Sequence, residues 1–254
     1  AKDKAKEKAN GQGNAADSAT DAAAAADAQR NDAVRAGALG ALGKVTPKAL
    51  RALPGAPFLS MHATAAELKK LGKAKGVLAI ERDRVFDAAG TSSFGAANGI
   101  QLPTWWHLQQ QGLTWTKANG YTGSGQAVVV IDSGVDKTHP WLAGKVVNEA
   151  CFATNLNGTG ACPGNVTSLY DSTPGGVAGS AMPPMLSASF AHGTHVAHSA
   201  AGAYGAAPGA GIIAIRAAHA EWDAKQGTYV ARFNWSDIQN ALWYVWGPLY
   251  YTPA

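Results

Sequence analysis

The stretch Val128-Val-Val-Ile-Asp132-Ser-Gly134 decides the fold of this chain. A run of apolar residues that ends in an acid and a glycine is typical of a buried parallel strand that carries a carboxylate at its carboxyl end. In open α/β sheets, ligands and catalytic groups collect at this edge. We therefore expect Asp132 to be a functional residue at the edge of a mainly parallel sheet.

A second stretch, His192-Gly-Thr-His195-Val-Ala197, follows sixty residues later. The small residues after His192 predict a helix that can bring this histidine beside Asp132. An Asp–His pair forms two members of the triad that serine hydrolases use. An Asp after a strand is often only a turn residue, and a single His is usually structural. The two together favour the catalytic interpretation.

Four motifs in this chain resemble those of the subtilisin-like serine proteases (subtilases), and they occur in the same order. They are Val130-Ile-Asp-Ser-Gly134 with Thr138-His-Pro140, the histidine motif at 192–197, the segments 205–210 and 212–216, and the helix start Ser236-Asp-Ile238. The resemblance implies an α/β fold with a mainly parallel sheet flanked by helices. Residues 57–84 are similar to the back half of the inhibitory propeptide that precedes such enzymes.

The resemblance also implies a role for each motif residue. Asp132 would orient His192, and His192 would act as general base for a serine. The residues expected to be structural near this site are Ser133, Gly134, Gly193, Thr194 and His195. The family's serine motif, Gly-Thr-Ser followed by a small residue and Pro, appears nowhere in the 254 residues.

The missing serine determines how we interpret the activity. We expect a serine endopeptidase precursor, acting on proteins or peptides, whose nucleophile lies outside this chain. The sheet would then be incomplete at its C-terminal side, and this chain alone would be inactive. The alternative is a catalytically inactive pseudoprotease, or a propeptide-type inhibitor that binds a protease cleft.

Composition divides the chain into three predicted parts. Residues 1–50 are poor in large apolar side chains and are expected to be disordered, with at most a transient helix over 21–41. Residues 51–90 would be a partial, half ferredoxin-like propeptide that inhibits its own protease. Residues 91–254 would be the front of the catalytic domain. Processing is expected between residues 88 and 102, in or just after a Gly/Ser/Ala-rich linker at 88–99.

Local patterns predict several elements. In the propeptide part we expect strands at 58–62 and 76–80, joined by a helix that begins at the capping box Thr64–Glu67. A buried strand is predicted at 212–215. A helix that begins near Ser236 would bury one face, made of Ile238, Ala241, Leu242 and Val245.

The only two cysteines are Cys151 and Cys162, which bracket a loop rich in Gly and Asn. Such a pair suits a disulfide in an exported protein, although two free thiols remain an alternative. We therefore expect secretion, but no signal-peptide pattern is visible in this sequence. No run of eighteen apolar residues occurs, so we expect no membrane span.

The basic charge lies at the front of the chain. Residues 1–90 hold 15 Lys/Arg against 10 Asp/Glu, whereas residues 91–254 hold 6 against 7. The first four lysines alternate with Ala and acids, without aromatic residues, which is typical of a solvated tail. We therefore expect no nucleic-acid partner.

No metal site is assigned from the sequence. His192, His195 and His198 spread around a helix at a spacing of three residues, unlike the i, i+4 pair of zinc proteases. No cofactor is required by the expected mechanism. Calcium often supports subtilases, but the long loop at 153–190 contains one acid, Asp171, and we assign no calcium site there.

Overall fold

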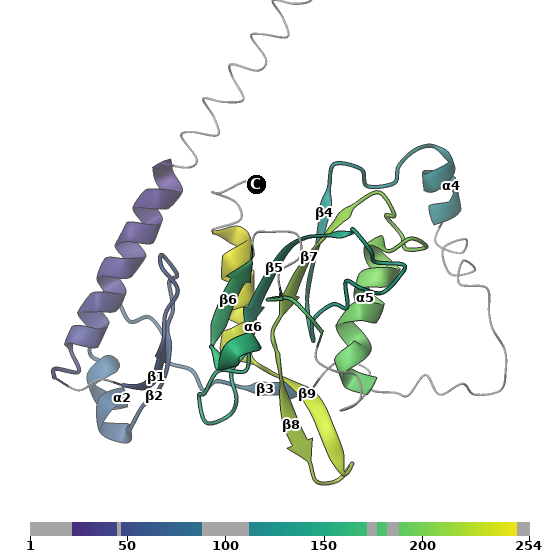
Figure 1. The fold of residues 1–254 in the computed structure, drawn as a ribbon. Coiled ribbons are helices and arrows are strands. Elements are labelled where there is room, and N and C mark those ends of the chain that lie inside the picture. The colour runs from purple at the N-terminus through teal and green to yellow at the C-terminus, as the bar shows by residue number, and fades with distance from the viewer. Residues whose placement is uncertain (1–21, 45–46, 88–111, 172–176, 182–187, 248–254) are drawn as a thin grey trace, which may run out of the picture. The chain divides into compact units, whose positions relative to one another are not determined.

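The computed structural model describes residues 22–44, 47–87, 112–171, 177–181 and 188–247 (Figure 1). Two compact units are present. One holds the residues up to Arg82 together with Trp246 and Gly247, and the other runs from Asp83 to Val245. The predicted linker at 88–99 and the processing region up to residue 102 lie outside the described residues.

The first unit contains a helix over residues 22–40, where the sequence analysis expected a transient helix within a disordered tail. The amide of Asn31 donates to the Gly55 carbonyl at 2.8 Å, and Arg35 donates to the Leu53 carbonyl at 2.6 Å. These contacts fix the helix to the turn that follows the first strand. An alanine-rich helix that is marginal alone is stabilised by such tertiary contacts.

Two short strands, β1 (Lys48–Arg51) and β2 (Ser60–His62), pair in antiparallel fashion in this unit. The helix α2 (Ala65–Leu71) follows β2 and begins with the predicted capping box, in which Thr64 and Glu67 bond each other's main-chain N–H groups.

The second strand predicted for this unit, at 76–80, is wrong. Residues 77–80 have no regular structure, and Leu78 is 99% exposed. The position beside β2 is taken by β1. An apolar run forms a strand only where a partner strand and a buried face exist for it.

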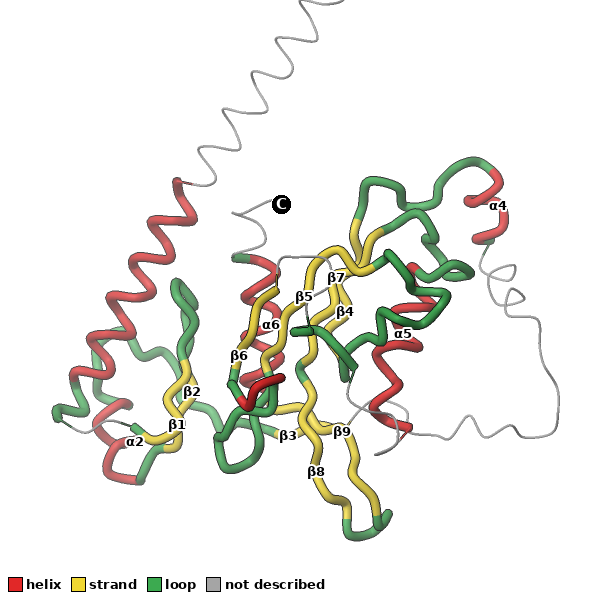
Figure 2. Tube along the Cα trace, in the orientation of Figure 1, coloured by secondary structure: helices red, strands yellow, loops and turns green. Residues whose placement is uncertain are grey.

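The second unit is built on a four-stranded sheet with the order β4-β7-β5-β6 (Figure 2). Its members are β4 (Ala127–Asp132), β7 (Gly211–Arg216), β5 (Val146–Phe152) and β6 (Ser168–Asp171). The first three are parallel to one another, and only β6 is antiparallel. The predicted mainly parallel sheet and the predicted strand at 212–215 are confirmed.

Helices cover this sheet on both sides. On one face, α5 (His192–Ala201) packs through Ala197 and Ala201 against a cluster that includes Val130 of β4. The neighbouring residue Ile131 packs against a second cluster, together with Ile238 of α6 (Trp235–Trp246). Successive side chains of a strand point to opposite faces, so α5 and α6 lie against opposite faces of the sheet.

The predicted buried face of α6 is only partly right. Ala241 and Tyr244 are buried, whereas Leu242 is 51% exposed. Tyr244 contacts Phe152 of β5 at a ring-centroid distance of 5.5 Å, and its hydroxyl donates to Asn148 at 3.0 Å. This aromatic contact, rather than leucine, determines which side of α6 faces the sheet.

A second sheet of this unit has the order β3-β9-β8. Strands β8 (Ala218–Asp223) and β9 (Thr228–Asn234) form an antiparallel hairpin that extends past the ends of the parallel strands in Figure 1. Strand β3 (Val85–Asp87) lies on the outer edge of β9. A short helix α4 (Leu113–Ala118) precedes β4, and two 3₁₀ turns, η1 (Pro163–Asn165) and η2 (Ala188–Ala191), complete the unit.

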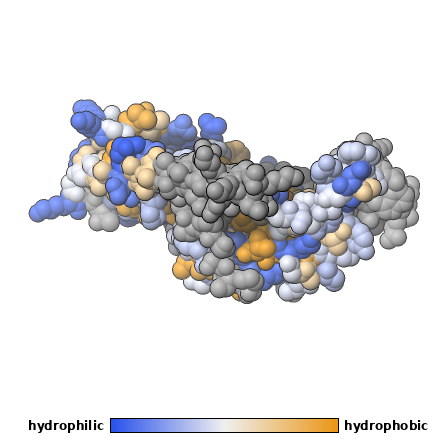
Figure 3. Space-filling model, turned by 90° about the horizontal axis from the view of Figure 1, so that it is seen from above, coloured by the Kyte–Doolittle hydropathy of each residue, from blue (hydrophilic) through white to orange (hydrophobic). Residues whose placement is uncertain are grey.

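The surface of the described residues mixes polar and apolar groups. Figure 3 shows hydrophobic residues in several separate groups among hydrophilic ones. None of the helices in the described part of the chain is long and apolar enough to cross a membrane.

The predicted disulfide between Cys151 and Cys162 is present and is buried. It closes the loop that leaves β5, and Ala153 packs beside it. The bond therefore holds the carboxyl end of β5 in place.

The loop after β4 is held against α5 by an aromatic contact. The Trp141 ring lies 4.7 Å from the His198 imidazole, and Tyr204 meets Trp141 edge-on at 5.4 Å. Burial lowers the pKa of His198 below its ordinary value of 6.5, and the nearby His139 and His195 lower it further.

Reduction of the disulfide should destabilise the second unit. Loop closure over this span is worth about 3 kcal/mol in the chain-entropy description. We expect the double variant Cys151→Ser/Cys162→Ser to lose a free energy of unfolding of that order in urea titrations. Added reductant should bring the unchanged protein to the same value. A variant as stable as the oxidised protein would contradict this prediction.

Stability should fall as the pH falls through the range of histidine titration. Because the pKa of His198 is lower in the folded than in the unfolded state, the unfolded state binds the proton first below pH 6.5. We expect the free energy of unfolding to decrease between about pH 7.5 and 5.5. His198→Gln should show a weaker decrease, because it removes the titrating group. Equal pH dependence of the two proteins would assign the effect to other residues.

Candidate active site

The Asp132 carboxylate lies at the carboxyl end of β4, as predicted. One of its oxygens accepts the Ser133 main-chain N–H at 2.6 Å, and its side chain is 13% exposed. The register pairs Asp132 with Arg216 at the same end of β7. The carboxylate is thus fixed at the sheet edge where α/β proteins place their chemistry.

The imidazole of His192 meets this carboxylate directly. His192 is the first residue of α5, and its Nδ1 lies 2.9 and 3.0 Å from the two Asp132 carboxylate oxygens. The ring is 26% exposed. With Nδ1 directed at the carboxylate, Nε2 lies on the far side of the ring, where a general base receives its proton.

Two glycines fit close main-chain contacts around this site. A Cβ on Gly193 would lie 2.3 Å from the Gly134 carbonyl oxygen and 3.0 Å from the Asp132 Cβ. Gly134 itself has a φ of 98°, and a Cβ there would lie 2.4 Å from the Ser180 carbonyl oxygen. A side chain at Gly193 would push the helix away from the strand and separate the Asp–His pair, whereas one at Gly134 would displace the segment that contains Ser180.

The side chain of Ser133 joins the strand to the helix. Its hydroxyl donates to the Phe190 carbonyl at 3.1 Å and accepts the Gly193 N–H at 3.0 Å, and the residue is fully buried. Thr194 makes a similar link, because its hydroxyl accepts the Asp136 N–H at 2.9 Å. Both residues hold the site together.

His195, expected to be a structural residue near this site, lies at the surface of α5. It is exposed, and with Trp141 and His198 it lines a cavity of about 470 Å³ beside α5. Within the described residues, no group of three or more His, Cys, Asp or Glu side chains is arranged to hold a metal ion.

Sequence reasoning missed the contact between β3 and β9. The main-chain N–H of Trp235, which follows β9, donates to the Arg84 carbonyl at 2.7 Å, and Phe86 meets the Trp235 ring edge-on at 6.1 Å. The Asp83 carboxylate accepts the Ser236 N–H at 2.9 Å and its hydroxyl at 2.6 Å, at the first turn of α6. An acid at this end of a helix also interacts favourably with the helix dipole.

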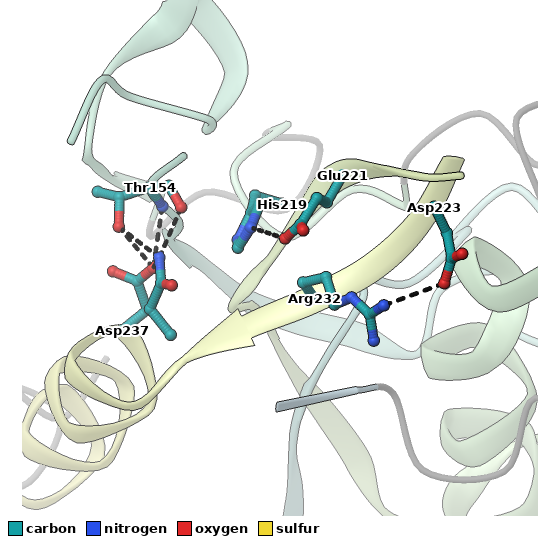
Figure 4. A network of polar contacts seen from close by, with 7 residues as sticks. Thr154, His219, Glu221, Asp223, Arg232 and Asp237 are labelled. Carbon is teal, nitrogen blue, oxygen red and sulfur yellow. Dashed lines mark hydrogen bonds and ion pairs between the residues drawn. The ribbon is translucent and has the colours of Figure 1, made fainter. Parts of the chain in front are cut away.

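A buried carboxylate anchors the start of α6 to the disulfide loop (Figure 4). Asp237 is fully buried and accepts the main-chain N–H and the hydroxyl of Thr154 at 2.9 and 2.8 Å. The amide of Asn234 donates to the same carboxylate at 3.2 Å and to the Thr154 carbonyl at 2.7 Å. The end of β9 is thereby fixed beside β5.

The hairpin carries further charged groups on the face that Figure 4 displays. Arg232 pairs with Asp223 at 3.1 Å across the two strands. His219 lies 3.6 Å from Glu221 and is almost fully buried. Burial lowers the pKa of His219, while Asp237 and Glu221 act in the opposite direction.

Arg216 is a buried cation near the sheet edge. Burial lowers the pKa of its guanidinium to about 10, and the guanidinium donates to the Ala161 carbonyl inside the disulfide loop. It therefore keeps its charge at neutral pH.

Sequence reasoning also missed the β8–β9 hairpin, although the sequence contains a pattern that indicates it. Polar and apolar residues alternate over 218–223 and again over 231–234, on either side of a Lys-Gln-Gly turn. Alternation on both sides of a glycine turn is typical of a hairpin. The Asp83 contact had no such signal, since it joins residues 153 positions apart.

Comparison with known families agrees with the site geometry. Residues 123–241 match the family model described as the Subtilase family. The match includes Asp132 and His192 and extends through most of α6. The part of the chain that forms this site is therefore a segment of a subtilase domain, the domain of subtilisin-like serine proteases.

Proposed function

We propose that this chain is the front part of a serine endopeptidase precursor. The observation that carries the proposal is the contact of the His192 Nδ1 with both oxygens of Asp132. In serine proteases a carboxylate placed in this way holds the imidazole in the correct tautomer and stabilises its protonated form. A serine hydroxyl supplied near Nε2 would complete the triad.

The proposed chemistry follows from this geometry. His192 Nε2 would take the proton of the serine hydroxyl as its oxygen attacks the scissile carbonyl, and would return the proton to the leaving amine. Asp132 would remain ionised throughout. Side chains alone supply these steps, so we propose no cofactor and assign no calcium site.

We propose that protein substrates lie in extended form on the outer edge of β9. That edge already pairs with an extended segment, β3, of the same chain. The chain's own front part would thus occupy the substrate position and inhibit the enzyme as a propeptide. The cap that Asp83 forms on α6 supports this arrangement, because it fixes β3 to the catalytic unit.

We also propose that the protein is exported. The buried disulfide between Cys151 and Cys162 is of a kind that persists in oxidising compartments.

A pseudoprotease or a propeptide-type inhibitor is the second candidate. Occupation of the β9 edge by β3 also suits a protein that binds without turnover. The serine-directed experiment below distinguishes the two candidates.

The gene product that carries this chain should be tested with a fluorophosphonate probe and a peptide substrate. We expect probe labelling of one serine and hydrolysis that His192→Ala or Asp132→Asn reduces roughly 10⁴-fold or more. His195→Gln is the matched control on the same helix and should retain activity. Absence of both labelling and hydrolysis, together with inhibition of another subtilase, would select the inhibitor.

The Asp83 cap should hold β3 in place. We expect Asp83→Ala to lower the free energy of unfolding by about 1 kcal/mol, the usual worth of a capping carboxylate. Limited proteolysis should also cut near β3 faster than in the unchanged protein. Glu81→Ala, which removes an exposed acid two residues earlier, is the control. Equal cleavage rates for the two variants would show that the cap does not retain β3.

A further inference from the structure

Glu149 is a buried carboxylate on β5 that the proposed mechanism does not use. Its side chain is 2% exposed. One carboxylate oxygen accepts a hydrogen bond from the Lys137 ammonium, and the other accepts the Gly179 N–H at 3.1 Å. A buried charge is retained only where it is paired and hydrogen-bonded. Glu149 therefore connects β5 to two segments that lie 12 and 30 positions from it in the chain.

The two segments that the Glu149 carboxylate holds lie side by side, next to Gly134. The Val135 N–H donates to the Gly179 carbonyl at 2.8 Å, and Val135 pairs with Ser180 in a parallel bridge. A Cβ on Gly134 would lie 2.4 Å from the Ser180 carbonyl oxygen. The main chain that follows Asp132 is thus in close contact with the main chain that Glu149 binds.

The segment that contains Gly179 has little room to move. Besides the turn after β4 it also contacts β7, because a Cβ on Gly179 would lie 2.3 Å from the Ala214 carbonyl oxygen. Both Gly179 and its neighbour Ala178 are buried. Close-packed interiors compress little and transmit strain, so a shift of Gly179 would displace Gly134 as well.

Gly134 is also the residue against which α5 rests. A Cβ on Gly193 would lie 2.3 Å from the Gly134 carbonyl oxygen. His192, the neighbour of Gly193, is the first residue of α5 and the histidine of the Asp–His pair. A series of main-chain contacts thus joins Gly179 to His192 through Gly134. Glu149 fixes the first residue of this series.

We propose that Glu149 is a positioning residue for the Asp–His pair. By holding Gly179 it fixes the main chain of Gly134, and this keeps His192 within reach of the carboxylate on β4. Glu149 acts through these main-chain contacts and not on the reacting atoms. The inference rests on the proposed function for its effect on hydrolysis, whereas the placement of His192 can be measured without turnover.

Proton NMR of the full chain tests the placement of His192. The ring proton on Nδ1 is held in a charge-assisted hydrogen bond to Asp132, and its resonance can be assigned by its loss in His192→Gln. We expect this proton to exchange with water about tenfold faster in Glu149→Ala, because Gly179 is released and the pair opens more often.

Tyr244→Phe is the matched control. It removes a different buried hydrogen bond, from the Tyr244 hydroxyl to Asn148, the residue before Glu149 on β5. We expect the His192 ring proton to exchange there as slowly as in the unchanged protein. Equal exchange rates in Glu149→Ala and in the control, whether slow or fast, would overturn the proposal, because Glu149 would then affect only the general stability of the unit.

Should Glu149→Ala fail to fold, the double variant Glu149→Leu/Lys137→Met is measured in its place. It removes both charges together and so leaves no buried charge without a partner, a change that proteins often tolerate. The double variant still lacks the acceptor for the Gly179 N–H, so we expect the same faster exchange of the ring proton. Slow exchange in the double variant would overturn the proposal.

Kinetics give a second readout in the gene product that carries this chain. We expect Glu149→Ala to lower kcat about 100-fold with little change in KM, since a misplacement of about 1 Å has an effect of this size and the β9 edge is not altered. An equal loss of kcat in Tyr244→Phe would contradict the inference. A lack of hydrolysis in the unchanged protein would instead count against the proposed protease function, and the exchange result would stand by itself.

Discussion

The close approach of α5 to the end of β4 is the constraint on which the rest of the site depends. The Gly193 main chain lies so near Gly134 that even one methyl group would not fit between them. Only at this separation can an imidazole on the first residue of the helix bond both oxygens of a carboxylate on the strand. The buried hydroxyl of Ser133 then fixes the distance, because it ties the strand to the main chain on either side of His192.

The centre of the fold could be predicted because it is encoded locally. Strand β4, with its acid and glycine, and the small residues after His192 carry their patterns within a few consecutive residues. The same holds for the capping box at Thr64. Where the pattern depended on a distant partner, prediction failed. Residues 77–80 have the composition of a strand but no neighbouring strand with which to pair. On α6, Tyr244 packs against Phe152, and the Leu242 side chain is exposed instead of buried.

The unit also contains contacts that could not be predicted from any single stretch of the sequence. The bond between Ser189 and Ala231 joins residues 42 positions apart, and that between Asp83 and Ser236 joins residues 153 apart. Each links a loop to a main-chain donor, so the partner could be almost any residue type. Such contacts follow from the topology, which places β3 and η2 beside β9. These contacts hold η2 and α6 to their neighbours, whereas the motif residues form the Asp–His pair.

The disulfide loop has a consequence for the order in which this unit is assembled. Cys151 and Cys162 bracket Thr154, whose main-chain and side-chain donors bind Asp237, 83 positions further along the chain. Once the covalent bond forms, the short ring has already lost most of its freedom, so docking of the later helix costs less conformational entropy. Oxidation of Cys151 and Cys162 thus orders the loop to which α6 binds before α6 itself has been synthesised. The redox state of the compartment in which the chain emerges therefore affects how readily the helix after β9 finds its place.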